Sequence, residues 1–313
     1  MTEGEDSLAT RAAWLHYVGG MTQSAVAKRL GVPSVKAHRL IAKAVAEGKV
    51  KVSIEGDIVE CVRLEAELVR RFGLRHCEVS PDLGEDGIPF RALALAGAGF
   101  LRRQFEAGEH KTIGLGHGST LAETTRALPK MDATGLRFVS LLGGLTRNFS
   151  ANPHDVMHRI AEKTGARAYV MPVPFFANTV EDREVLLAQH GVDEVFRMAE
   201  AATLKIVGIG TVDVGAQLVS SGMIEPAEID EIAALGAVGE MLGYFYDVEG
   251  RVLDTALSAR TIAVTHDHSP EEEVIAIAGG PRKTAAIRAV LRSGRISGLI
   301  TDEATARNVL NAN

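Results

Sequence analysis

The stretch MTQSAVAKRLGVPSVKAHRLIAKAVAEG, residues 21–48, carries the signals for two short helices joined by a tight turn. The hydroxyl of Thr22 can accept backbone N–H groups at the start of the first helix, and Gly31 ends that helix. Pro33 cannot donate a backbone hydrogen bond, and Ser34 can cap the helix that follows. We expect the apolar residues of the second helix to face the core; they are Val35, Leu40, Ile41, Ala44 and Val45.

Segments on either side complete a small N-terminal domain. Residues 8–18, LATRAAWLHYV, place apolar side chains at helical spacing before a pair of glycines. Residues 49–56, KVKVSIEG, alternate charged and apolar residues with a period of two, which is typical of a strand. Three helices followed by a short strand or wing predict a winged helix-turn-helix over residues 1–56.

The charge of the chain is unevenly distributed. The formal net charge is -6, yet the segment from Thr22 to Lys51 holds seven basic residues against the single acid Glu47, so it carries +6 and leaves -12 for the remainder. A basic second helix in a helix-turn-helix lies in the major groove of DNA, and only that docking face must neutralise phosphates. The alternative interpretation is a solvated, lysine-rich helix.

The docking interpretation assigns roles to individual side chains of the two helices. We expect contacts to bases or nearby phosphates from Ser34, Lys36, Ala37, His38 and Arg39. We expect contacts to the DNA backbone from Thr22, Gln23 and Lys43.

The character of the sequence changes after a predicted helix over residues 58–72, which is suited to linking two domains or pairing two subunits. From there on, short β-branched or apolar runs alternate with helical stretches, without internal repeats. This alternation predicts an α/β domain over residues 57–313 with a Rossmann-like parallel sheet covered by helices on both faces. We expect this larger domain to bind an effector and to form the oligomer.

Four of the apolar runs end in glycine-rich loops: TIGLGHGST (112–120), FVSLLGGL (138–145), KIVGIGTVD (205–213) and VIAIAGGPRK (274–283). The loops after parallel strands converge on one crevice, where glycine lets the backbone approach a ligand. A single loop of this kind can equally be a tight turn, but four together predict a common pocket. The candidate effector-binding residues are Gly116, His117, Gly118, Ser119, Thr120, Gly143, Gly144, Phe175, Asp213, Glu240 and Lys283.

Several of these candidates have a plain structural alternative. Phe175 can wall the crevice or belong to the core, and Asp213 can accept hydrogen bonds from vicinal hydroxyls or cap a turn. Glu240 can be a pocket acid or a surface residue, and Lys283 can meet an anion or be solvated at a helix start. Asp302 is predicted to cap the last helix.

Other classes of site and location have little support in the sequence. The loops match neither the dinucleotide fingerprint nor the phosphate loop, so we expect no nucleotide cofactor. The two cysteines, Cys61 and Cys77, lack metal-ligand spacing, so we expect neither a metal nor a disulfide. No apolar run reaches the length of a bilayer span and the first residues are acidic, unlike a signal peptide, so we expect no membrane contact and a cytoplasmic location.

A series of motifs resembles the SorC family of bacterial transcription regulators over nearly the whole chain. Besides residues 21–48, the segments that carry the resemblance are IGLGHGSTL, LLGGLTRN, MPVPFFA, GIGTVD, GEMLGYFYDVEG and AGGPRKTAAIRAVLRSGRISGLITDEATA. The resemblance implies a repressor of a sugar or polyol operon, a domain similar to sugar-phosphate isomerases, and a homodimer or homotetramer on operator DNA. The implied effector is a small carbohydrate or polyol, such as erythritol, or a sugar phosphate. His117 departs from many members, which carry tryptophan or another residue there, so the resemblance does not fix the effector's chemistry.

Two alternatives belong to other functional classes. The large domain could be an active sugar-phosphate isomerase or deaminase with a DNA-binding appendage, using Asp213, Glu240 or His117 as acid and base. The chain could also bind a polyol without binding DNA, which conflicts with the +6 segment. We expect a regulator without catalytic residues, and turnover of ribose 5-phosphate or glucosamine 6-phosphate would favour the enzyme.

Overall fold

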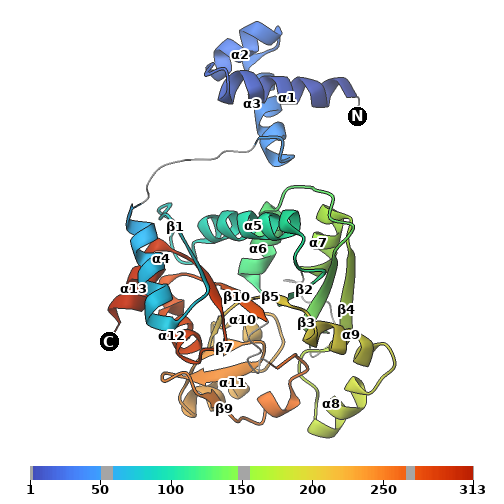
Figure 1. Ribbon diagram of the computed structural model, residues 1–313, viewed down its shortest axis with the longest axis vertical. Coiled ribbons are helices and arrows are strands. Elements are labelled where there is room, and N and C mark those ends of the chain that lie inside the picture. Colours follow the sequence, from blue (N-terminus) through green and yellow to red (C-terminus); the bar gives the residue numbers. More distant parts are fainter. Residues whose placement is uncertain (1–2, 51–58, 147–155, 266–271, 313) are drawn as a thin grey trace. The chain divides into compact units, whose positions relative to one another are not determined.

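The computed structural model describes residues 3–50, 59–146, 156–265 and 272–312 (Figure 1). The chain divides into two compact units, Met1–Asp57 and Ile58–Asn313.

The first unit packs three helices around a small core. They are α1 (Glu3–Tyr17), α2 (Gln23–Leu30) and α3 (Ser34–Ala46), and α3 contacts both others. Thr22 caps α2 by accepting the N–H of Ala25 at 3.2 Å, and Gly31 ends it with φ at 66°. The predicted helix-turn-helix is therefore confirmed. Its core residues include Ala9, Ala12, Leu15, Val26, Ala37, Leu40, Ile41 and Ala44.

Some details of this unit differ from the sequence prediction. α1 begins five residues earlier than expected, in an acidic stretch that suits the positive end of a helix dipole. Ser34 is the first residue of α3 and makes no cap, because Pro33 occupies the cap position. Val35 and Val45 are 74% and 46% exposed, so their assignment to the core is wrong: one face of α3 suffices to pack the unit. Most of the predicted wing, residues 51–56, lies outside the described residues.

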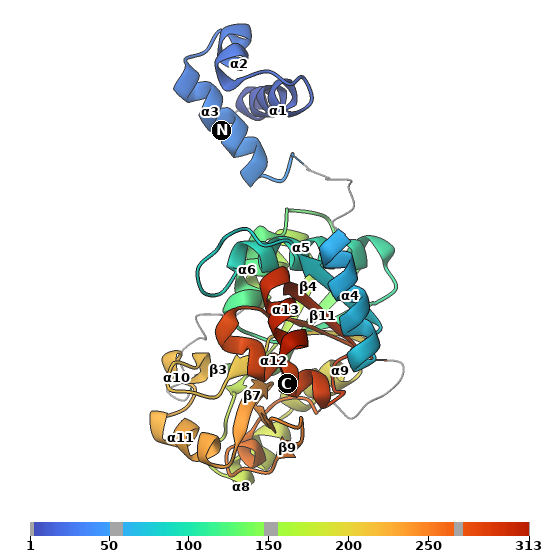
Figure 2. The same ribbon diagram turned by 90° about the vertical axis from the view of Figure 1, so that its left-hand side faces the viewer.

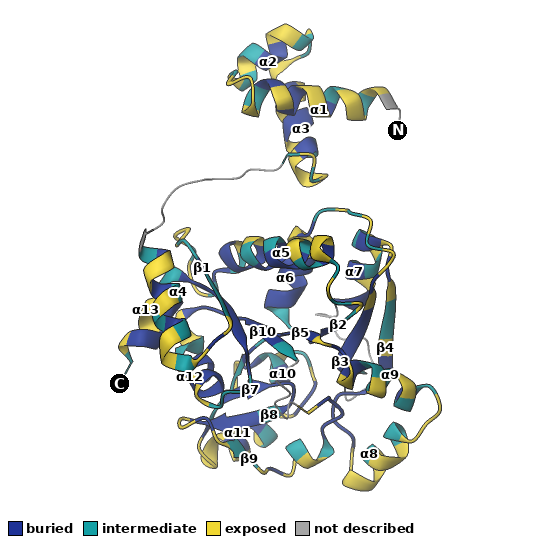
Figure 3. Ribbon diagram, viewed as in Figure 1, coloured by how far each residue is buried: buried dark blue, intermediate teal, exposed yellow. Residues whose placement is uncertain are grey.

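The second unit is built on a seven-stranded parallel sheet, which confirms the predicted α/β class. The order of its strands is β1-β11-β10-β5-β2-β3-β4. Their bounds are β1 (His76–Ser80), β2 (Thr112–Leu115), β3 (Arg137–Leu145), β4 (Arg167–Pro174), β5 (Leu204–Val207), β10 (Glu273–Ile277) and β11 (Gly298–Asp302). Figure 3 shows the five inner strands largely buried between helices, whereas the edge strands β1 and β4 are partly exposed.

Helices cover both faces of this sheet, as predicted. On one face lie α5 (Phe90–Ala107), α6 (Ser119–Ala127) and α7 (Met157–Thr164). On the other lie α4 (Val59–Phe72), α9 (Val192–Glu200), α12 (Thr284–Arg292) and α13 (Glu303–Asn311), and Figure 2 shows α4, α12 and α13 grouped together. Strand residues alternate between the two cores: Leu204 and Ile206 face the first group, and Val207 faces the second.

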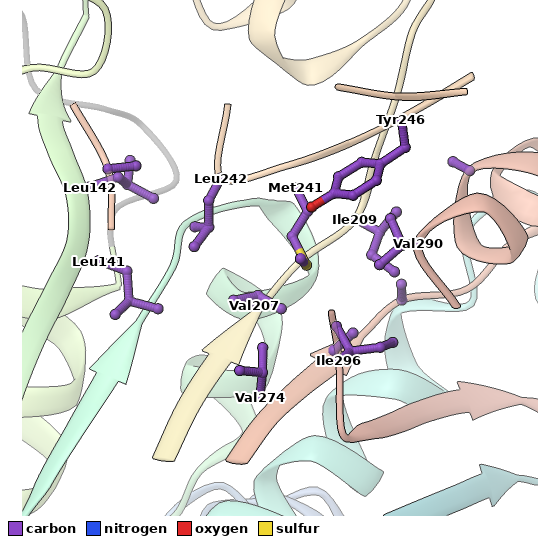
Figure 4. Close-up of a cluster of buried hydrophobic side chains, with 14 of the residues drawn as sticks. Leu141, Leu142, Val207, Ile209, Met241, Leu242, Tyr246, Val274, Val290 and Ile296 are labelled. Atoms are coloured by element: carbon purple, nitrogen blue, oxygen red, sulfur yellow. The ribbon is translucent and has the colours of Figure 1, made fainter. Parts of the chain in front are cut away.

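A second, four-stranded antiparallel sheet was not predicted. It orders β6 (Gly210–Thr211), β7 (Ala237–Met241), β8 (Tyr244–Asp247) and β9 (Val252–Leu253). Leu242 and Gly243, with φ at 53° and 78°, form the two-residue turn between β7 and β8. Figure 4 shows Met241, Leu242 and Tyr246 of this sheet meeting Leu141, Val207 and Val274 of the parallel sheet in one apolar cluster.

The remaining helices and caps complete the unit. They are α8 (Val180–Leu187), α10 (Gln217–Ser220), α11 (Pro226–Ala234) and the 3-10 turns η1 (Ser258–Arg260) and η2 (Pro281–Lys283). Asp302 accepts the N–H of Thr305 at 2.9 Å, which confirms its predicted cap of α13. Among the described helices, none combines the length and apolar character needed to cross a membrane.

Candidate functional site

A pocket of about 410 Å³ lies at the carboxyl ends of β2, β5 and β10. Three of the four glycine-rich loops contribute to it, at residues 117–121, 208–211 and 280–283. The antiparallel sheet adds Glu240 and the turn residue Leu242, and α10 adds Gln217. Its volume is in the range of small-molecule sites, and its position is the crevice where open parallel sheets bind ligands.

The loop between β2 and α6 forms one wall of this pocket. Gly118 has φ at 128°, a conformation that L side chains rarely adopt, and places Ser119 at the first turn of α6. The N–H of Ser119 donates to Oε1 of Gln217 at 3.0 Å, so the loop is tied to α10. The wall is thus fixed by a contact between residues 98 positions apart.

Two buried polar atoms beside the pocket lack a hydrogen-bond partner within the described residues. They are Oγ1 of Thr120 and Nε2 of Gln217, and both residues line the pocket. A buried donor or acceptor without a partner costs about 1–3 kcal/mol. A ligand that carries hydroxyl groups can both donate to the Thr120 oxygen and accept from the Gln217 amide.

Glu240 and Lys283 form an electrostatic pair in the same pocket. Burial raises the pKa of Glu240 to about 7, against the opposing effects of the Gly243 N–H and the Lys283 ammonium. Burial lowers the pKa of Lys283 to about 8, opposed by the Glu240 carboxylate. Oε1 of Glu240 accepts the N–H of Gly243 at 2.6 Å, and Nζ of Lys283 donates to the carbonyl of Ile209 at 2.7 Å. Both groups therefore titrate near neutral pH.

The structure brings together six of the predicted effector-binding residues in the pocket wall: His117, Gly118, Ser119, Thr120, Glu240 and Lys283. It places Asp213 beside the wall, where its carboxylate accepts from the Gly215 N–H at 2.7 Å and from Arg282, a lining residue, at 3.1 Å.

The remaining predicted residues lie outside the pocket lining. Gly143 and Gly144 belong to β3, and Gly143 lies so close to the Pro174 backbone that a side chain would collide with it. The expectation that all four loops share the pocket is therefore wrong for the loop at residues 138–145. Gly143 there serves the close approach of β3 to β4. The N–H of Gly116 bonds to the carbonyl of Ile206. Phe175 is buried, and its ring meets the His117 ring edge-on with the two ring centroids 5.2 Å apart, so it belongs to the core.

Sequence reasoning missed several lining residues. Gln217 and Ser220 come from α10, and Gly87 and Ile88 precede α5. Arg282 did carry a signal in the sequence, because it is a cation that closely follows Gly279 and Gly280. Gln217 carried no local signal, since its role depends on a contact with α6.

The basic residues of the first unit fall into two groups. Lys28, Arg29, Lys36 and Arg39 are exposed, and the described residues offer them no ion pair. Lys43 is bound to Asp6 at 2.6 Å and lies 3.7 Å from Glu47, which in turn holds Lys49 at 2.7 Å. The α2 and α3 side of the unit therefore presents unneutralised cations, whereas the end of α3 is neutralised internally.

The other predicted DNA-facing residues are placed as follows. Ser34 and His38 are exposed on α3, Thr22 is exposed with its hydroxyl engaged in the α2 cap, and Gln23 is half-buried. Ala37 is fully buried in the core of the unit, so the prediction that its side chain faces DNA is wrong. Helical spacing puts it on the same side as Leu40, Ile41 and Ala44.

No group of three or more potential metal ligands occurs among the residues that the structure describes.

Comparison with known proteins places both units in a family. Residues 56–311 match the family described as "Putative sugar-binding domain". The erythritol catabolism regulatory protein EryD of Brucella abortus (strain 2308) is 65% identical over 310 residues, 99% of this chain and 98% of the relative. The transcriptional regulator LsrR of Klebsiella pneumoniae subsp. pneumoniae is 33% identical over 98% of this chain and 93% of the relative.

The full-length sorbitol operon regulator SorC from Klebsiella pneumoniae shares the fold, with a TM-score of 0.72 over 97% of this chain and 98% of that chain at 24% identity. The chain belongs to the SorC family of sugar-binding transcriptional regulators. The pocket of this SorC-family regulator lies wholly within the matched residues 56–311, whereas α1, α2 and α3 precede them. The two units therefore separate an N-terminal helix-turn-helix from the sugar-binding domain.

Proposed function

We propose that this regulator represses an operon for the use of a small polyol, binding operator DNA through α2 and α3 and releasing it when the polyol occupies the pocket. The observation that carries the proposal is a pair of buried polar atoms beside a pocket of about 410 Å³: Thr120 Oγ1 and Gln217 Nε2 find no hydrogen-bond partner among the residues that the structure describes. The Brucella abortus relative, 65% identical over nearly the full length, is named for erythritol catabolism. This name supports erythritol as the first effector to test.

The DNA-binding part of the proposal rests on charge and exposure. Lys28, Arg29, Lys36 and Arg39 are exposed cations that carry no ion pair in the described part of the chain. Each cation that neutralises a phosphate releases a counterion, so binding weakens steeply with salt. Ser34, His38 and Gln23 complete the proposed face, with Thr22 near the DNA backbone.

The effector part rests on the polar groups of the pocket. Thr120, Gln217 and Glu240 offer donors and acceptors for several hydroxyl groups at once, and Ile209, Leu218 and Leu242 offer apolar contact for a carbon chain. We assign Ser119, Glu240 and Lys283 to the effector site together with His117 and Gly118. Arg282 and Lys283 are cations that can bind a phosphate group, so the test includes the polyol and its phosphorylated form.

The assembly and its regulation belong to the same proposal. A homodimer or homotetramer presents two copies of α3 to the two half-sites of an operator, as helix-turn-helix proteins do. Effector in the pocket then favours a subunit arrangement whose half-site spacing no longer fits the DNA. We assign residues 1–56 to DNA binding and residues 57–313 to effector binding and oligomerisation, and we place the protein in the cytoplasm.

The experiment is fluorescence anisotropy of the full-length protein with labelled DNA from upstream of its own operon. A salt series is run without effector and with erythritol, erythritol phosphate or ribose 5-phosphate. Saturable, salt-sensitive binding that one compound releases supports the proposal and identifies the effector form. Sequence-independent binding that no compound alters contradicts it.

One observation favours a second candidate, an enzyme. Glu240, with its pKa raised to about 7, lies in the pocket with Lys283, and a carboxyl group of that pKa can act as a general acid or base. We propose that the pair binds effector hydroxyls and does not turn the effector over. Incubation of the protein with ribose 5-phosphate and glucosamine 6-phosphate, followed by chromatography of the products, tests this directly: turnover that Glu240→Gln abolishes would establish the enzyme.

A further inference from the structure

The outward side of α3 carries an apolar group among cations. Val35, His38, Arg39 and Ala42 are spaced i, i+3, i+4 and i+7, so they lie along one stripe of the helix. All four are exposed, and the opposite side of α3 packs the unit through Ala37, Leu40, Ile41 and Ala44. The stripe is therefore available to a partner and is not needed for the core.

Val35 is the unusual member of this stripe. Its side chain is 74% exposed although it is β-branched and apolar, and it lies in the first turn of α3. A single exposed apolar residue needs no explanation by itself. Here, however, Lys36 follows it directly and Arg39 lies one turn on, and the described residues provide neither with an ion pair. A partner that covers Val35 must therefore be strongly anionic and also offer an apolar group.

Duplex DNA meets both requirements in the major groove. Its phosphates complement the exposed cations Lys36 and Arg39, and thymine presents a C5-methyl group there, the apolar feature of the base edges. The first residues of a recognition helix are the ones that reach base edges, which is where Val35 lies. Val45, which is 46% exposed on the last turn of the same helix, lies far from that end.

We propose that Val35 is a specificity-determining residue that packs against the methyl group of a thymine in each operator half-site. This inference rests on the proposed DNA binding through α3 and deepens it by naming the base that one side chain recognises. Burial of one methyl group against another apolar group is worth about fourfold in binding, the equivalent of about 0.8 kcal/mol.

The test deletes the methyl group from the DNA. The shortest duplex that the full-length protein protects in its own upstream region is synthesised with deoxyuridine in place of thymidine, one symmetric pair of positions at a time. Affinities are measured by anisotropy for the wild type, Val35→Ala and the matched control Val45→Ala. Circular dichroism melting confirms that both variants are folded.

We expect one thymine pair at which deoxyuridine weakens wild-type binding by about fourfold per half-site. Val35→Ala should bind the thymine and deoxyuridine duplexes equally at that pair, and Val45→Ala should keep the full difference. The same deoxyuridine effect in Val35→Ala as in the wild type, or no sensitive thymine at all despite tight binding, overturns the inference and leaves the proposed function intact. Absence of specific DNA binding by the wild type overturns both.

Discussion

The backbone N–H of Ser119 donates to Oε1 of Gln217 at 3.0 Å and so joins the first turn of α6 to α10 across the pocket. The amide nitrogen of the same Gln217 side chain is buried and finds no partner among the described residues. One side chain therefore holds the wall in place and keeps a donor for a ligand.

Replacement of Gln217 by alanine removes both functions. We expect about tenfold weaker binding of the effector in calorimetry, since a hydrogen bond contributes about 0.5–1.5 kcal/mol and two are lost. Gln217→Glu keeps the acceptor for Ser119 but loses the donor, so its affinity for the effector should lie between those of the wild type and Gln217→Ala. Gln189→Ala, at an exposed glutamine outside the pocket lining, is the matched control. Equal affinities for Gln217→Ala and wild type would remove Gln217 from the site.

The stability of the second unit should depend on pH through Glu240. Because burial raises its pKa from 4.5 to about 7, the folded state binds more protons than the unfolded state between these values. Stability is therefore expected to fall as the pH rises from 4.5 to 7, by up to about 3 kcal/mol from this residue. Lys283, with its pKa lowered to about 8, acts in the opposite sense above pH 8, where stability should rise.

Urea unfolding followed by far-UV circular dichroism at pH 5 and pH 7 measures this dependence. The free energy of unfolding of Glu240→Gln should fall much less between pH 5 and pH 7 than that of the wild type. Glu231→Gln, at an exposed position of α11, should show the full wild-type fall. A pH profile that Glu240→Gln leaves unchanged would show that another group controls it.

The pocket should not tolerate a side chain at position 210. A Cβ atom on Gly210 would lie 2.5 Å from Oε2 of Glu240, so Gly210→Ala must displace the carboxyl group. We expect a loss of about 1–3 kcal/mol in unfolding free energy, together with a weaker effector response. Gly135→Ala, where the added atom would meet nothing within 4 Å, should change neither quantity. Wild-type effector release by folded Gly210→Ala would argue against a role for Glu240.

The two groups of basic residues should differ in their effect on operator binding. Arg39→Ala removes a cation that has no ion pair within the described part of the chain, and it should reduce the salt slope of log affinity by about one, as should Lys36→Ala. Lys43→Ala removes an ammonium already bound to Asp6 and Glu47, so its effect on the slope should be smaller. Anisotropy between 50 and 200 mM salt, the range over which such slopes are measured, compares the three. Equal slopes for all three variants would contradict the division.

The part of the fold that local signals encode was predictable from the sequence. The cap at Thr22, the left-handed glycine at position 31 and the cap at Asp302 all depend on neighbours within a few residues. The parallel sheet followed from apolar runs alternating with helical stretches. The antiparallel sheet was missed because its central turn uses Leu242 and Gly243, which lack the Asn-Gly signature of a two-residue hairpin.

The candidate site was predictable where glycine precedes a helix and unpredictable where tertiary contacts decide. The loop at residues 117–120 has a glycine directly before a predicted helix, and it lines the pocket. Gly143 looked the same in sequence, but β3 continues through it and uses its missing side chain to approach Pro174. Val35 was expected in the core and Ala37 at the DNA, but Val35 is exposed and Ala37 is buried. Hydrophobicity alone does not tell which side of α3 packs on α1 and α2.

The pairing of β1 with β11 sets the order in which the two units can form during synthesis. The first unit closes through contacts within its own fifty or so residues, which favours rapid folding as it leaves the ribosome. The second unit cannot complete its sheet until residues 298–302 have been made, because they lie between β1 and β10. A nascent or prematurely terminated chain would thus carry a folded helix-turn-helix unit before the sheet beside the pocket is complete, and under the proposed function such a chain would bind DNA without control by the effector.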